Sequence, residues 1–142
     1  MNDDRIHEPR ADAALGHALA RLALGMNIAM HGYTRLPNIN GFASALVKQF
    51  ARTFLPAQLV YVTAYGIAIG EALIGTCLFF GLLLRPALVF GTLLMLLLLF
   101  GSTLTQQWEI ASIQLTYVAF YVGLLVTLAF DRFSLDALRS RK

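Results

Sequence analysis

Charged side chains are scarce in this sequence: Asp, Glu, Lys and Arg make up 13% of the 142 residues, whereas 58% are hydrophobic. A soluble domain ordinarily carries about a quarter charged residues, and one of this size cannot bury so much apolar surface. The hydrophobic residues also come in long runs, and crossing the hydrocarbon of a bilayer takes about 20 of them. The composition therefore excludes an ordinary soluble domain and predicts a membrane protein.

Cysteine is nearly absent, with Cys77 as the single one. One thiol excludes an internal disulfide relay and a multi-cysteine metal site, so Cys77 is best interpreted as a small packing residue. Two of the three histidines, His17 and His31, would lie about 21 Å apart on one helix, too far for the axial positions of one haem. Because no His, Cys and carboxylate cluster has metal-ligand spacing, neither a metal nor a haem is predicted.

The sequence also lacks the patterns typical of nucleotide binding, nucleic-acid binding and a signal peptide. There is no phosphate loop or GxGxxG pattern for a nucleotide. The cations flank the hydrophobic runs and do not cluster with aromatic residues, so nucleic acid is not an expected partner. The first twelve residues, MNDDRIHEPRAD, lack the basic start and cleavage site of a signal peptide, so the first helix is expected to be retained.

Four hydrophobic stretches are long enough to span a bilayer, and no linker marks a second domain. Only helices or closed barrels satisfy the backbone in lipid, and a barrel would need alternating strands. The sequence therefore predicts an all-α, polytopic transmembrane four-helix bundle, a single domain over residues 1–142. The expected spans are about Ala13–Tyr33, Leu59–Leu84, Pro86–Leu104 and Ile110–Phe130.

Between the first two spans, residues 41–55 form a short amphipathic pattern bounded by Pro37 and Pro56. Apolar residues recur every fourth position, which predicts a helix in the membrane interface; they are Phe42, Leu46, Phe50 and Phe54. This helix is interpreted either as a lid on the mouth of the bundle, which is slightly preferred, or as a gate beside the access route of a lipid-soluble substrate.

The second span carries Gly66 and Gly70 in GxxxG spacing, with small alanines beside them. Small residues at this spacing let helix backbones approach closely in lipid. The second helix is therefore expected to be central to packing, either within the chain or across a homo-oligomer.

Three polar residues inside the expected spans, Arg21, His31 and Glu71, are candidates for chemistry, because such groups are costly in lipid. Arg21 and Glu71 would each lie about 18 Å from the outer ends of antiparallel helices, which predicts an ion pair. The pair is interpreted as structural or functional with equal weight.

A polar seam is expected to run inward from the outer surface. Asn27 and His31 share one sector of the first helix with Arg21, and a face of the fourth helix carries Gln114, Tyr117 and Tyr121. His31 is either an interfacial hydrogen-bonding residue or a group that exchanges protons near neutral pH. The tyrosines are by default packing and interfacial residues.

Several segments resemble the DoxX family in the right order. These are RLALGMNIAMHGYTRL from Arg21, the connector GFASALVKQFARTFLP, the second helix GEALIGTCLFFGLLLRPA and the terminal DRFSLDAL. The resemblance covers roughly residues 20–138 and implies a four-helix protein of the bacterial inner membrane.

Relatives that gave the family its name belong to thiosulfate:quinone oxidoreductase, so the resemblance implies a membrane subunit of a quinone-linked oxidoreductase. On this analogy Arg21, His31 and Glu71 would line a quinone site, with Asn27, Gln114, Tyr117 and Tyr121 beside it. A partner subunit or soluble redox protein would supply the electron-donor site. The alternatives are a non-catalytic anchor or assembly subunit and a small proton-coupled transporter.

The distribution of cations yields a testable prediction of topology. Four spans place both termini on one side, with seven cations against three in the first loop of the other side. The positive-inside rule then puts both termini in the cytoplasm. Reporter fusions before Met1 and after Lys142 should report cytoplasm, and fusions between Pro37 and Pro56 should report the outer side. Termini on opposite sides would contradict the four-span topology.

Overall fold

The computed structural model describes residues 8–139, and these are mostly helical. In chain order the helices are α1 (Glu8–Arg35), η2 (Leu36–Asn38), α2 (Ile39–Gln49), α3 (Ala57–Phe80), α4 (Leu84–Leu104), α5 (Trp108–Val126), η3 (Leu128–Phe130) and α6 (Leu135–Arg139). Four helical stretches are long and apolar enough to cross a membrane, the first of them running on into α2. The predicted all-α, polytopic four-helix bundle is confirmed.

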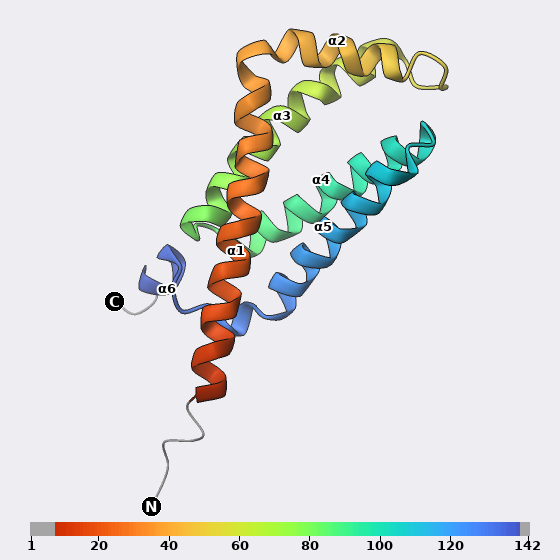
Figure 1. The fold of residues 1–142 in the computed structure, drawn as a ribbon. Coiled ribbons are helices and arrows are strands. Elements are labelled where there is room, and N and C mark those ends of the chain that lie inside the picture. The colour runs from red at the N-terminus through yellow and green to blue at the C-terminus, as the bar shows by residue number, and fades with distance from the viewer. Residues whose placement is uncertain (1–7, 140–142) are drawn as a thin grey trace, which may run out of the picture.

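The long helices form two antiparallel pairs, α1 with α3 and α4 with α5 (Figure 1). The pairs meet mainly where α3 is followed by α4, and they separate toward the opposite end, where α2 lies along the first half of α3. The start of α1 and helix α6 lie at the end remote from α2 (Figure 1). We call the two ends of the bundle the lid end, at α2, and the terminal end, at α6.

Glycine brings α1 and α3 into backbone contact. A Cβ on Gly75 of α3 would lie 2.1 Å from the Ala29 nitrogen, and one on Gly32 of α1 would lie 2.2 Å from the Ala72 nitrogen. Both positions therefore require glycine. The expected close packing of the second span occurs within the chain, but through other residues than Gly66, whose Cβ would meet nothing within 4 Å. A homo-oligomer through the Gly66 and Gly70 face stays a prediction.

Two helices end earlier than the hydrophobic runs suggest. The second span was expected to reach Leu84, but α3 ends at Phe80 because Gly81 adopts a left-handed conformation with φ 70°. The Leu82 nitrogen then donates to the Cys77 carbonyl at 2.8 Å, which closes the helix in a Schellman turn. Likewise α5 ends at Val126 and not at Phe130, with a turn of 3-10 helix after it.

At the terminal end, the segment after α5 fastens the turn between α3 and α4. The Asp136 carboxylate accepts a hydrogen bond from the Leu84 nitrogen at 2.8 Å, and the Asp136 nitrogen donates to the Gly81 carbonyl at 3.0 Å. Ser134 is fully buried against Gly81, and its hydroxyl accepts from the Ala137 nitrogen at 2.9 Å at the start of α6. We call these contacts, with those of Arg21 described below, the terminal clasp.

The connector between α1 and α3 is shorter as a helix than its pattern suggests. Asn38 caps α2 by accepting from the Gly41 nitrogen at 3.1 Å, and α2 ends at Gln49, six residues before the expected end. Phe42, Leu46 and Phe50 face the bundle as expected, whereas Phe54 lies beyond the helix and is 76% exposed. Helix α2 thus covers the mouth of the bundle, as its interpretation as a lid predicts.

Candidate functional site

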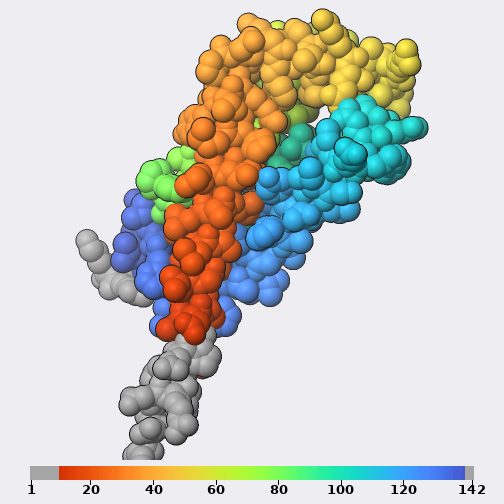
Figure 2. All heavy atoms as spheres, in the orientation of Figure 1, coloured from red at the N-terminus to blue at the C-terminus, as the bar shows by residue number. Residues whose placement is uncertain are grey.

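A cavity of about 430 Å³ lies beneath α2, where the two helix pairs separate. Figure 2 shows the surface hollowed below α2, between α1 and the hairpin of α4 and α5. The lid side chain Phe50 spans the cavity to α4, since a Cβ on Gly101 would lie 3.0 Å from its ring. The walls are mainly apolar with a few polar groups, the usual character of a small-molecule site. Polar lining residues include Arg35, Gln49, Thr63, Ser102, Gln107 and Gln114.

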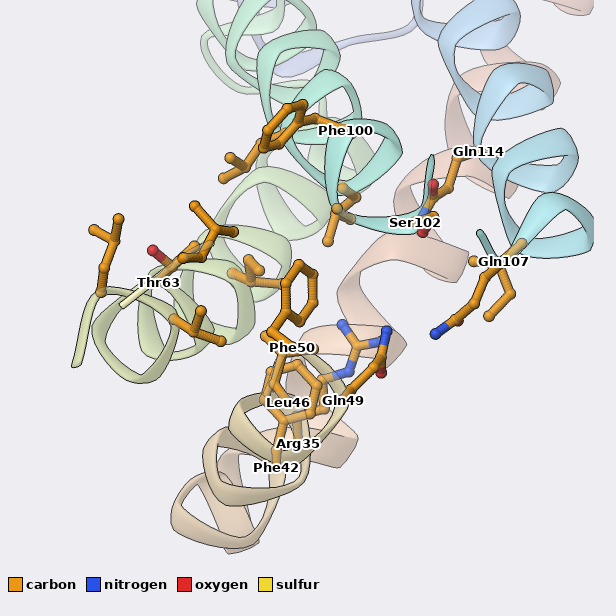
Figure 3. Close-up of a pocket in the computed structure, with 18 residues that line it drawn as sticks. Arg35, Phe42, Leu46, Gln49, Phe50, Thr63, Phe100, Ser102, Gln107 and Gln114 are labelled. Carbon is orange, nitrogen blue, oxygen red and sulfur yellow. The ribbon is translucent and has the colours of Figure 1, made fainter. Parts of the chain in front are cut away.

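Arg35, the last residue of α1, forms an ion pair with Glu71 of α3 at this cavity. Glu71 is buried, while the guanidinium of Arg35 stands 4.7 Å above the ring of Phe42. Figure 3 shows Arg35 beside Phe42 and Leu46 of α2, with Gln114 of α5 on the other side of the view. The pair holds a charged hydrogen-bond donor at the edge of an apolar chamber, where such a donor is strong.

The prediction that Arg21 pairs with Glu71 is wrong. Arg21 is buried at the terminal end, where Nη1 donates to the carbonyls of Leu78 at 2.5 Å and Phe79 at 2.7 Å, and Nη2 donates to that of Phe133 at 3.3 Å. It satisfies carbonyls left open at the end of α3 and places a cation at the negative end of the helix dipole. Arg21 is therefore part of the terminal clasp.

The prediction failed because it assumed that the outer ends of α1 and α3 lie at the same depth. In the structure Arg35, at the end of α1, pairs with Glu71, and fourteen residues of α3 come before Glu71. Those residues extend about 21 Å beyond α1 at 1.5 Å per residue, and α2 packs along them. The lid thus shifts the register of the two helices by several turns.

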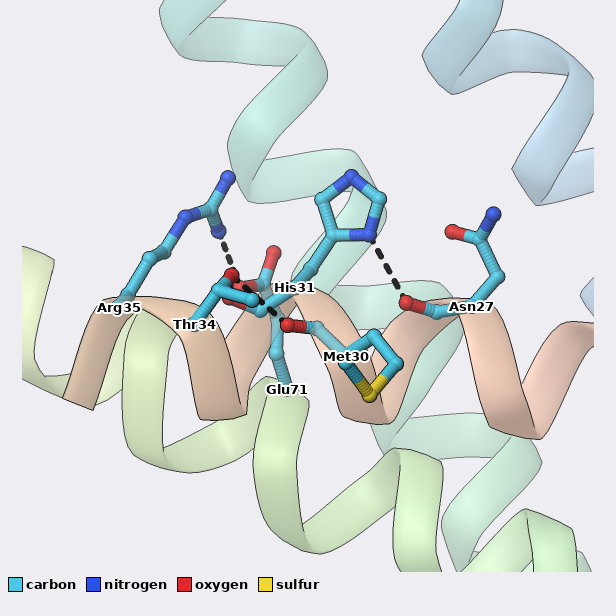
Figure 4. Close-up of polar contacts among 6 residues, drawn as sticks. All are labelled: Asn27, Met30, His31, Thr34, Arg35 and Glu71. Atoms are coloured by element: carbon cyan, nitrogen blue, oxygen red, sulfur yellow. Dashed lines mark hydrogen bonds and ion pairs between the residues drawn. The ribbon is translucent and has the colours of Figure 1, made fainter. Parts of the chain in front are cut away.

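A line of polar side chains continues from Arg35 down the same face of α1. Asn27, His31 and Arg35 are four residues apart, and Figure 4 shows all three on one side of the helix, with Glu71 rising from α3 between Arg35 and His31. Tyr117 of α5 extends the line by donating to Asn27 Oδ1 at 3.0 Å. The structure therefore brings together most of the expected polar seam.

His31 is exposed, and its Nδ1 lies 2.9 Å from the Asn27 carbonyl oxygen. A carbonyl only accepts, so Nδ1 carries the hydrogen, and Nε2 of the neutral ring is an acceptor. The backbone contact thus orients the ring with its basic nitrogen away from α1.

Gln114 and Tyr121, which were also expected in the polar seam, lie apart from this line of side chains and from each other. Gln114 lines the cavity, is only 9% exposed, and its Oε1 has no hydrogen-bonding partner among the described residues. Tyr121 does not reach the cavity: it is fully buried, and its ring occupies the space that Gly91 of α4 leaves open.

The sequence analysis missed Arg35 because it counted this residue only as a cation of the first loop. Its spacing of four and eight residues from His31 and Asn27 was the signal for it.

Comparison with known proteins identifies one family. The DoxX family model matches residues 16–104, well over half of the chain, from the first span to the end of α4. No curated protein and no solved structure matches the chain. The matched segment contains Arg35, His31 and Glu71 but not Gln114.

The ion pair gives a prediction that distinguishes Arg35 from Arg21. Glu71→Gln or Arg35→Gln alone strands one member of a pair whose carboxylate is buried, so the double variant should lose less stability than the sum of the two. The expected coupling is about 1–3 kcal/mol, measured by unfolding in detergent. The matched pair Arg21→Gln and Glu71→Gln should be additive. Coupling of Glu71 to Arg21 and not to Arg35 would contradict the observed register.

Proposed function

Since this chain belongs to the DoxX family of membrane proteins, we propose that it is the membrane subunit of a quinone-linked oxidoreductase and binds a quinone head group beneath α2. The observation that carries the proposal is the apolar cavity between the helix pairs, with the Arg35–Glu71 pair at its edge. A lipid-soluble ring needs apolar walls with a few oriented polar groups, and the cavity offers both.

The polar groups fit a head group that alternates between carbonyl and hydroxyl. A bound quinone would supply the redox chemistry by taking up two electrons and two protons. Arg35 donates hydrogen bonds and suits a carbonyl oxygen, while the buried and unpartnered Gln114 Oε1 suits a hydroxyl. The two groups line the same cavity and approach it from different helix pairs (Figure 3).

Proton exchange is assigned to His31 and Glu71. His31 is exposed, its Nδ1 is held by the Asn27 carbonyl so that Nε2 can accept a proton, and Glu71 rises from α3 beside it (Figure 4). Together with the Asn27–Tyr117 hydrogen bond they form a polar line from the surface of the bundle to Arg35. The role of Arg21 is positional, because the terminal clasp holds α3 and with it Glu71.

The proposal includes a location and a partner. We place the protein in a bacterial inner membrane with both termini in the cytoplasm, so the cavity opens toward the outer side. Electrons would come from a partner subunit or soluble redox protein docked at the lid end. The alternative of a non-catalytic anchor is favoured by one observation, the use of Arg21 as a purely structural group.

Extraction of co-purified quinone tests the site. Thr63 lines the cavity and is labelled in Figure 3, whereas its neighbour Val62 is 59% exposed on the outer face of α3. Thr63→Phe should fill the cavity and lower bound quinone about tenfold, which takes only about 1.4 kcal/mol of lost affinity. Val62→Phe should retain it. Absence of quinone from the unmodified protein, purified in mild detergent, would favour the anchor.

Turnover tests the role of His31. If His31 exchanges protons, His31→Gln should lower donor-dependent quinone reduction by roughly 10²–10⁴-fold and flatten the pH–rate profile near neutrality. The assay uses membranes that contain the native partner. Arg10→Gln, a change at an exposed position near the opposite end of α1, is the control and should leave turnover unchanged. A normally expressed His31→Gln variant with an unaltered profile would contradict the catalytic role.

A further inference from the structure

The cavity beneath α2 reaches the surface of the bundle through an apolar opening. Three of its lining residues are also about half exposed: Leu59 of α3 at 54%, and Leu97 and Phe100 of α4 at 45% and 50%. A side chain that both lines a cavity and faces outward stands where the cavity opens. We call this opening, between the first half of α3 and the second half of α4, the lateral mouth.

The lateral mouth lies where α3 and α4 separate. A Cβ on Gly70 of α3 would lie 3.6 Å from Cδ2 of Leu94 on α4, in ordinary contact. One on Gly66, a turn nearer the lid end, would meet nothing within 4 Å, so the two helices touch at Gly70 and have separated at Gly66. Leu97 lies seven residues before the end of α4, about 10 Å inside it at 1.5 Å per residue. At this depth the mouth faces hydrocarbon.

Polar lining residues gather away from the lateral mouth. Figure 3 shows Ser102, Gln107 and Gln114 close together on the hairpin of α4 and α5, while Thr63 and Phe100 lie away from them. The hairpin thus gives one side of the cavity neutral hydrogen-bonding groups, and the side toward the lateral mouth is mainly apolar.

The passage between α1 and α5 is polar as well. Arg35 ends α1 at the cavity, and the hydrogen bond from Tyr117 to Asn27 Oδ1 at 3.0 Å joins the two helices nearer the terminal end. A hydrocarbon chain laid across these groups would cover polar atoms without offering them hydrogen bonds, which costs free energy. A chain laid between Leu59 and Leu97 would meet apolar side chains only. The cavity therefore has a polar side that suits a ring and an apolar side that suits a chain.

We propose that the substrate of the cavity is a quinone with a long hydrocarbon tail, which binds with its ring toward Arg35 and Gln114 and its tail in the lateral mouth. The inference rests on the proposed function and adds to it the substrate class and the route of entry, sideways from the bilayer between α3 and α4. A ring without a tail lacks the contacts with Leu59, Leu97 and Phe100, so it binds less tightly.

Photo-crosslinking tests this orientation. The unmodified protein in phosphatidylcholine nanodiscs is irradiated with a benzoquinone whose saturated tail carries a diazirine near its middle, and the labelled residues are mapped by mass spectrometry. Labels that an excess of unlabelled quinone displaces mark the site. The same tailed quinone without the diazirine is the control for the photochemistry of the ring. We expect displaceable labels on α3 near Leu59 and on α4 near Leu97 and Phe100.

Two other results would contradict the inference in different ways. Displaceable labels confined to other positions, such as α1 and α5 near Asn27 and Tyr117, would overturn the orientation and leave quinone binding intact. The absence of displaceable labels anywhere in the chain would overturn the proposed function together with the inference.

A matched pair of variants tests the lateral mouth itself. Leu97→Trp overfills the mouth, whereas Leu96→Trp changes the preceding residue, which is equally exposed at 45% but does not line the cavity. Leu97→Trp should lower displaceable labelling about tenfold, the scale of an overpacked contact, and Leu96→Trp should keep it. Binding of a tail-less benzoquinone, measured by equilibrium dialysis, should be the same in both variants. In a stably folded Leu97→Trp protein, an equal loss of tailed and tail-less quinone, or no loss of either, would overturn the inference.

Discussion

The architecture depends on the backbone contact between α1 and α3, where Gly32 and Gly75 allow each helix to touch the other's main chain. Close contact of this kind fixes the register of two helices, since neither can slide without a collision. The register sets Glu71 opposite Arg35 and leaves the first half of α3 extending past α1. That extension carries α2, and the space between α2 and the second helix pair is the cavity.

The two ends of the bundle differ in how their polar groups are satisfied. At the terminal end, Arg21 and Asp136 form hydrogen bonds with the backbone of α3 and α4, while Arg21 Nε, His17 Nε2 and Asp131 Oδ1 have no hydrogen-bonding partner among the described residues. At the lid end, Arg35 and Gln114 face an apolar chamber, and one of them is unpartnered in the described chain. Groups with spare hydrogen-bonding capacity in an apolar cavity are the usual mark of a ligand site. The terminal clasp joins the helix pairs at one end, and the pairs lie apart at the lid end.

Hydrophobic pattern alone was enough to predict the four spans and the amphipathic helix, because lipid imposes length and composition on each. Helix ends were harder: Gly81 stops α3 inside an apolar run, and the residues up to Leu84 look no different from helix in composition. Similarly, Phe54 continues the four-residue spacing of apolar residues in α2, although the helix ends at Gln49 and Phe54 is exposed.

The site was predictable in part. His31, Asn27, Glu71 and Gln114 stood out as polar residues in apolar segments, and the first three come together with Tyr117. The partner of Glu71 was not predictable from depth, since depth assumes that helices start at one level. Only the fold shows that α3 begins well beyond the end of α1, alongside α2. Glu71 therefore lies at the level of Arg35 and not at that of Arg21.

The terminal clasp has a consequence for biosynthesis. Its bonds join Arg21 to Phe133 and Leu84 to Asp136, contacts between residues 112 and 52 positions apart in the sequence. A ribosome adds residues 133–136 only after it has synthesised all four spans. The nascent bundle must therefore insert span by span while the end of α3 still lacks its final hydrogen bonds. The turn between α3 and α4 thus gains the contacts of Asp136 later than the packing of α1 against α3 can form.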